Sequence, residues 1–188
     1  MRSRVLLLAL LMAPIEARGG VLLERILAVV NGRPVLLSGV VLLERVKGLE
    51  EKKAVDAAID ERLMGEEAAQ LPQAAVSKDE EDRLYEELVA RLKGLPKDVT
   101  EEDMRLFVTR ELTILKYVDF RFRSEARVTD ADIQKAYDEE YENVKNPPDR
   151  AEAGEALRQR LEDAQVSRAV EAWVKELRGS AEILYTTP

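Results

Sequence analysis

The sequence predicts a mostly α-helical fold with a small β-hairpin near the N-terminus and a candidate strand at the C-terminus. Three observations carry this prediction. Helix-favouring Ala, Leu, Glu and Arg are abundant, whereas the 188 residues include only 9 Gly and 7 Pro. Apolar residues recur three and four positions apart through several long segments, as on one face of a helix. One Asn-Gly pair separates two short apolar runs, which is typical of a hairpin.

The hairpin is expected over residues 26–37. Ile26 to Val30 is a continuous apolar run, and Asn31-Gly32 supplies two residues that tolerate positive φ. Pro34 has no N–H to donate to a ladder, so the second strand should lie at an edge of the sheet. Because a lone two-stranded ribbon is only marginally stable in water, helices must pack against it.

Capping residues and Gly or Pro stops divide the rest of the chain into helices. Ser38 is placed to cap a short helix, and Ser77-Lys78-Asp79-Glu80 has the pattern of a capping box. Asn143 to Pro148 contains an Asn-Pro-Pro break, which predicts a bend. The sequence predicts helices over about 39–46, 50–70, 77–93, 100–123, from 128 onward and over 150–177, followed by a candidate strand at 181–185.

Met1 to Ala17 has the pattern of a cleaved secretory signal peptide. Arg2 and Arg4 give a positive start, and the apolar run from Val5 to Ala13 is too short to span a hydrocarbon core of about 30 Å. The sequence therefore predicts export to the periplasm without a stable membrane anchor. Residues 18–188 are expected to form a single helical domain, in which the C-terminal helix over 150–178 packs back on the N-terminal part.

Composition limits the chemistry that the protein can perform. The net charge of −8 makes nucleic acid and anionic lipid poor partners. The chain contains no His and no Cys, which excludes thiolate zinc sites, Ser-His-Asp triads and Cys-His dyads. No cofactor is expected, and only carboxylate, Lys or Tyr chemistry stays open.

The order of these features resembles a known family. Ile26 to Gly32, followed by Val35-Leu36-Leu37-Ser38, is similar to the opening of SurA-like periplasmic chaperones, in which a short hairpin leads through a Ser into helices. The resemblance implies a helical chaperone that binds unfolded or nascent envelope polypeptides, with its C-terminal segment folded back onto the N-terminal module. It continues through residues 59–63, 76–80 and 109–137 and through the closing helix with Trp173.

Two departures from that family matter. Members usually carry an acidic residue directly after the Ser, where this chain has Gly39. They also generally insert one or two parvulin-type prolyl-isomerase domains before the last helix, where only Glu142 to Asp149 is found here, and parvulin sites use a pair of His that this chain lacks. The resemblance therefore implies a chaperone without isomerase activity, and not an enzyme.

Four residues are candidates for binding unfolded polypeptide: Tyr85, Met104, Tyr117 and Phe120. Tyr117 and Phe120 lie on the opposite side of their helix from Met104, Val108, Leu115 and Phe122, which would give the helix a second apolar face. The alternative is a helix buried between two neighbours. The acidic clusters 79–82 and 101–103 fall at helix N-termini, where negative charge is favoured without any bound Ca²⁺.

Two other functions stay open at this point. The same fold could serve as an interaction module for one fixed envelope partner, or as a hydrolase that uses carboxylates. A large apolar groove would favour the chaperone function, and a small flat apolar patch would favour a module for one fixed partner. A deep pocket with converging carboxylates of raised pKa would favour an enzyme.

Overall fold

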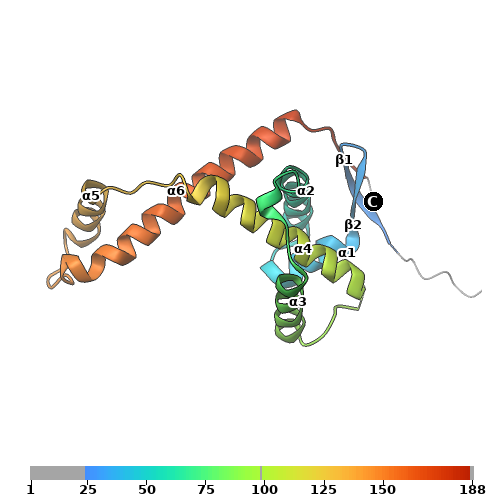
Figure 1. Cartoon of the computed structure of the whole chain (residues 1–188), viewed down its shortest axis with the longest axis horizontal. Helices are drawn as coiled ribbons and strands as arrows, with labels where there is room; N and C mark the ends of the chain where they lie inside the picture. Colours follow the sequence, from blue (N-terminus) through green and yellow to red (C-terminus); the bar gives the residue numbers. More distant parts are fainter. Residues whose placement is uncertain (1–23, 98, 187–188) are drawn as a thin grey trace, which may run out of the picture.

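The computed structural model describes residues 24–97 and 99–186 (Figure 1). The predicted signal peptide, residues 1–17, lies outside the described residues. None of the helices within the described ranges has the length and apolar character needed to cross a membrane.

The prediction of a mostly α fold with a small sheet is confirmed. Its elements are β1 (Ile26–Val30), β2 (Arg33–Leu36), α1 (Leu37–Lys47), α2 (Glu51–Ala68), the 3-10 turn η1 (Pro72–Ala74), α3 (Lys78–Leu92), α4 (Glu101–Val118), the π-helix η2 (Asp119–Arg123), α5 (Asp130–Tyr141), α6 (Arg150–Ser180) and β3 (Ile183–Tyr185).

The three strands form one antiparallel sheet in the order β2-β1-β3. Asn31 and Gly32, with φ of 49° and 76°, turn the chain between β1 and β2 in the left-handed region that two-residue hairpins require. Pro34 lies on β2, an edge strand, as its missing N–H predicted. Beyond β3, the Thr186 hydroxyl donates to the Ile26 carbonyl over 2.7 Å. The two ends of the described chain are therefore joined in one sheet.

Three helices begin at complete capping boxes. Ser77, Thr100 and Thr129 precede α3, α4 and α5. In each case the cap side chain accepts a hydrogen bond from the third backbone N–H of the helix, and the carboxylate at that third position accepts from the backbone N–H of the cap. These local contacts fix where the helices start, independently of how the helices pack.

The prediction that Ser38 caps the first helix is wrong. Helix α1 already begins at Leu37, with Leu36 at the cap position and no side-chain cap bond. Ser38 lies in the first turn and is buried, and its hydroxyl donates to Glu24 Oε2 over 2.8 Å. Glu24 Oε1 accepts from the Ser38 backbone N–H over 3.2 Å. Glu24 therefore contacts the start of the helix from outside, and β2 runs directly into α1.

The main core lies between the sheet and helices α1, α2 and α4, and α3 covers it from one side (Figure 1). Burial of apolar surface of this kind is the dominant stabilising contribution to a fold. The fully buried side chains of this core are Ala28, Val30, Val40, Leu42, Leu43, Ala54, Ile59, Met104 and Val108, with Phe107 only 1% exposed.

Helix α6 packs its C-terminal half against α2 and the end of α4. Trp173 belongs to a second buried cluster, together with Tyr117 and the small side chains of Ala68 and Ala74. Nearer the sheet, Arg178 pairs with Asp60 of α2. The last helix is thus held on the N-terminal helices by both apolar and charged contacts.

Helix α5 lies beside the N-terminal half of α6, away from the main core (Figure 1). A third cluster joins these two helices through Val128, Ile133, Ala153 and Leu157. The Tyr137 hydroxyl donates to the Pro148 carbonyl over 2.6 Å, across the predicted Asn-Pro-Pro bend. The two helices form a small lobe at the far end of α6.

Candidate functional site

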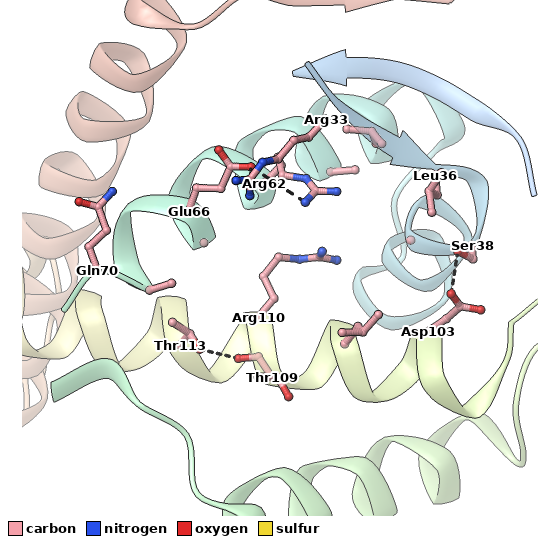
Figure 2. A pocket seen from close by; sticks show the side chains of 16 residues that line it. Arg33, Leu36, Ser38, Arg62, Glu66, Gln70, Asp103, Thr109, Arg110 and Thr113 are labelled. Atoms are coloured by element: carbon pink, nitrogen blue, oxygen red, sulfur yellow. Dashed lines mark hydrogen bonds and ion pairs between the residues drawn. The ribbon is translucent and has the colours of Figure 1, made fainter. Parts of the chain in front are cut away.

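A groove with a volume of about 710 Å³ opens between β2, the start of α1, and helices α2 and α4. Figure 2 shows side chains from all four elements pointing into it. Its apolar lining includes Val35 and Leu36 from the strand, Ala58 from α2, Ala69 directly after α2, and Leu106 from α4. The Leu106 side chain is 60% exposed, so the groove offers apolar surface to solvent.

Three arginines from three different elements line the same groove: Arg33 of β2, Arg62 of α2 and Arg110 of α4 (Figure 2). Arg62 Nη2 donates to the Pro34 carbonyl over 2.7 Å. Glu66 Oε1 lies 3.4 Å from Arg33 Nη1 and 4.0 Å from Arg62 Nη1. Burial, and then the positive charge of Arg110, lower the pKa of Arg62. The groove therefore concentrates positive charge in a chain whose net charge is −8.

Arg110 fits beside the groove because Gly65 leaves room for it, and Gly39 leaves the space beside its guanidinium open. A Cβ atom at Gly65 would lie only 3.0 Å from Arg110 Cγ, and a Cβ at Gly39 would lie 4.0 Å from Arg110 Nη2. The Arg110 Nε atom is buried and finds no hydrogen-bond partner in the part of the chain that the structure describes. Glu61 Oε2 lies 3.6 Å from it, so the two groups form an ion pair without a hydrogen bond. The guanidinium thus keeps donor capacity that the fold does not use.

Glu61 lies next to the groove without lining it. Its side chain is 3% exposed, and Oε1 accepts a hydrogen bond from Lys47 Nζ over 2.7 Å. Lys47 also donates to Glu111 Oε1 over 3.1 Å. Burial raises the pKa of Glu61 to about 8, the adjacent Glu111 carboxylate adds to the rise, and Lys47 opposes it. Glu61 can influence Arg110 from behind but does not face a molecule in the groove.

The four candidates named from the sequence do not line the groove. Met104 is fully buried in the main core, and Tyr117 is 6% exposed in the cluster with Trp173. Tyr85 is half-buried, with the Arg105 guanidinium 4.3 Å from its ring centroid. Phe120 is 52% exposed on the π-helix. Of the four, Phe120 presents the most surface to a partner.

Sequence reasoning missed the groove arginines, although two glycines marked their position. Gly65 stands inside a predicted helix, and Gly39 stands in the first turn of another. Because Gly destabilises a helix interior by about 1 kcal/mol relative to Ala, such positions often mark a close approach of another group. Only the folded chain shows that the group that closely approaches Gly65 is Arg110.

The acidic clusters at the starts of α3 and α4 form ion pairs. Arg105 Nη1 contacts Glu81 Oε1 and Asp82 Oδ1, each at 2.8 Å. The hydrogen bond from Arg105 lowers the pKa of Glu81, and that from Lys78 lowers the pKa of Asp82. Among residues 24–97 and 99–186, no group of three or more Asp, Glu, His or Cys side chains is arranged to hold a metal ion.

The chain was also compared with known proteins. Protein-family models, curated proteins and solved structures gave no match to it.

Proposed function

We propose that the protein is an exported, non-enzymatic chaperone-like module that binds unfolded or nascent envelope polypeptides in the groove between β2, α2 and α4. The observation that carries this proposal is the groove itself, which combines an apolar lining with three arginine side chains. The hairpin followed by capped helices, in the order found in SurA-like chaperones, supports the same function.

The groove has properties suited to an extended polypeptide. Its volume of about 710 Å³ falls in the range of roughly 300–1,000 Å³ that accommodates small ligands or short peptide segments. Leu36 and Leu106 offer apolar contacts, and long arginine side chains such as Arg33 can adapt to different sequences. Contacts of this kind favour broad rather than narrow specificity.

The carboxylates at the groove support a binding function over hydrolysis. Figure 2 places Glu66 and Asp103 at opposite ends of the groove. Glu66 lies beside Arg33, and Asp103 Oδ2 accepts a hydrogen bond from Thr100 Oγ1 over 2.6 Å. General acid–base chemistry at a glycosidic bond needs two carboxylates that flank one reacting site. These two do not face each other across the groove.

Suppression of aggregation tests the proposal directly. An outer-membrane protein is diluted from urea with and without residues 18–188 of this protein, and light scattering is followed. We expect reduced scattering, and we expect Leu106→Asp to weaken the effect. Leu115→Asp is the matched control, because Leu115 is 53% exposed on the same helix but does not line the groove. Unchanged scattering, or equal loss in both variants, would contradict the proposal.

The same assay separates a chaperone from a module for one fixed partner. A chaperone suppresses the aggregation of several unrelated unfolded proteins, whereas a fixed-partner module leaves them unaffected and binds one folded protein. Titrating two or three clients of different sequence therefore decides between the two functions.

A further inference from the structure

We propose that the arginine cluster of the groove, Arg33, Arg62 and Arg110, binds a carboxylate of the polypeptide, with Arg110 as the central contact. This inference rests on the proposed function, since the bound polypeptide supplies the carboxylate. It adds a chemical preference to a groove that would otherwise select clients by apolar contact alone.

Arg110 has hydrogen-bonding capacity to spare. Its buried Nε atom forms only a long ion pair with Glu61 Oε2, at 3.6 Å behind the groove, and makes no hydrogen bond within the described parts of the chain. Its Nη2 atom lies beside the empty position of Gly39, so a ligand in the groove that accepts from the Nη side of the guanidinium is favoured. A carboxylate is the natural acceptor, because its two oxygens match the fork of a guanidinium.

The space beside Arg110 is open and electrostatically suited to an anion. Gly39 has no side chain there, and its Cβ position would be 4.0 Å from Arg110 Nη2. At the start of the 11-residue helix α1, the Glu24 carboxylate already accepts hydrogen bonds from the Ser38 N–H and hydroxyl. The position left for a further anion is therefore the one beside the Arg110 guanidinium.

The charges that line the groove leave a positive excess. Three arginines face two carboxylates, Glu66 and Asp103. Asp103 Oδ2 is already hydrogen-bonded to Thr100, and its Oδ1 lies 3.3 Å from the Ser38 hydroxyl, whose shorter hydrogen bond is to Glu24. The chain as a whole carries a charge of −8, which disfavours anionic membranes and polyanions. A single carboxylate on an otherwise apolar peptide best matches a groove with a small positive excess in a negatively charged protein.

Four versions of one fluorescein-labelled apolar decapeptide test the proposal by fluorescence anisotropy. One has a free C-terminal carboxylate and no acidic side chain, the second an amidated end and one internal Glu, the third both carboxylates, and the fourth an amidated end with Gln in place of Glu. We expect at least one single-carboxylate peptide to bind about 10-fold more tightly than the neutral peptide, as for a charge-assisted hydrogen bond. Comparison of the first two peptides tells chain-end recognition from side-chain recognition.

Two variants and two controls test whether the preference for a carboxylate depends on Arg110. Arg110→Gln is expected to abolish the preference for a carboxylate. Arg45→Gln removes the same charge from an exposed position of α1 outside the groove and should preserve the preference. Gly39→Glu places a carboxylate of the protein itself beside Arg110, so it should also abolish the preference, whereas Gly39→Gln, of the same size, should preserve it. If Arg110→Gln does not fold, Gly39→Glu decides.

Several outcomes would overturn the proposal. The neutral peptide could bind as tightly as the others, Arg110→Gln could behave like Arg45→Gln, or Arg110 could be needed only for binding to vesicles that contain anionic lipid. If the neutral peptide binds and aggregation is suppressed, the proposed function survives this failure. If no peptide binds and aggregation is unaffected, both the function and the carboxylate preference are wrong.

Discussion

Trp173 on α6 stacks on Tyr117 on α4, with ring centroids 4.8 Å apart and ring planes inclined by 21°. The Tyr117 hydroxyl donates to Glu67 Oε1 on α2 over 2.8 Å. Both rings are almost fully buried, at 4% and 6% exposure. Three helices therefore meet at this pair, and the C-terminal helix is joined to the N-terminal helices through it.

Trp173→Ala should destabilise the whole protein. Removing a large buried aromatic side chain typically lowers the free energy of unfolding by about 3–5 kcal/mol. Trp173→Phe should have a smaller effect, because Trp173 Nε1 has no hydrogen-bond partner among the described residues. Urea denaturation should show a single transition at lower urea for Trp173→Ala, with Phe120→Ala as an exposed control. If a chain truncated after Pro148 unfolds at the full-length midpoint, α6 is an independent arm.

Glu61 should make stability depend on pH. Its pKa is about 8 in the folded chain and about 4.3 in an unfolded one, so folding favours the protonated carboxyl. This contribution is complete below about pH 4 and is lost as the pH rises through 8. We therefore expect Glu61→Gln to gain stability relative to the unsubstituted protein between pH 5 and pH 8.5. Urea denaturation at both pH values measures the difference, and a constant difference would contradict this role for Glu61.

The two glycines beside Arg110 should respond differently to alanine. At Gly39 a Cβ meets nothing closer than 4.0 Å, so Gly39→Ala should stabilise α1 by about 0.5–1 kcal/mol. At Gly65 a Cβ would lie 3.0 Å from Arg110 Cγ and 3.2 Å from Cδ, so Arg110 must move and the gain should disappear. Thermal denaturation should therefore rank Gly39→Ala above Gly65→Ala, and equal melting temperatures would argue against this packing.

Export is expected from the first residues. Arg2, Arg4 and the apolar run to Ala13 form the pattern of a signal peptide, with a cut expected after Ala17. N-terminal sequencing of protein from the envelope fraction should begin near Arg18. Recovery of the uncut chain from the cytosol would refute the periplasmic assignment.

The protein is not expected to catalyse prolyl isomerisation. The chain has no His or Cys, and only Glu142 to Asp149 separates α5 from α6. Isomerisation faces a barrier of about 18–20 kcal/mol, which requires a dedicated site to lower it. A protease-coupled assay on a Pro-containing peptide should show the uncatalysed rate. Acceleration that co-purifies with the protein would show that an isomerase site has been overlooked.

Features decided by neighbouring residues could be predicted from the sequence. The Asn31-Gly32 turn and the capping box at Ser77 depend on contacts within about four positions, and both are found in the structure. The boxes at Thr100 and Thr129 are equally local. Ser38 has the local sequence pattern of a helix cap, but it does not cap its helix. Glu24, 14 positions earlier, binds its hydroxyl and its backbone N–H, and no local rule contains that contact.

Features decided by packing could not be predicted in the same way. The helical pattern grouped Leu115 with Met104, yet Leu115 is 53% exposed while Tyr117, on the opposite side, is buried. The reason is that α4 changes neighbours along its length, from α1 and α3 to α6 near Tyr117, whereas a helical pattern assumes one partner. The groove was still harder to predict from the sequence, because its three arginines come from separate elements.

The sheet that joins both ends of the chain has a consequence for the order in which the protein folds. Thr186 and Ile26 are hydrogen-bonded although 160 positions separate them along the chain. Contacts between such distant residues form late, because a long loop must close first. While the chain is synthesised N-terminus first, β1 keeps one side without its β3 neighbour, and an open strand edge readily pairs with other chains. Until its last residues arrive, the protein is itself an incompletely folded polypeptide, of the kind that we propose it binds.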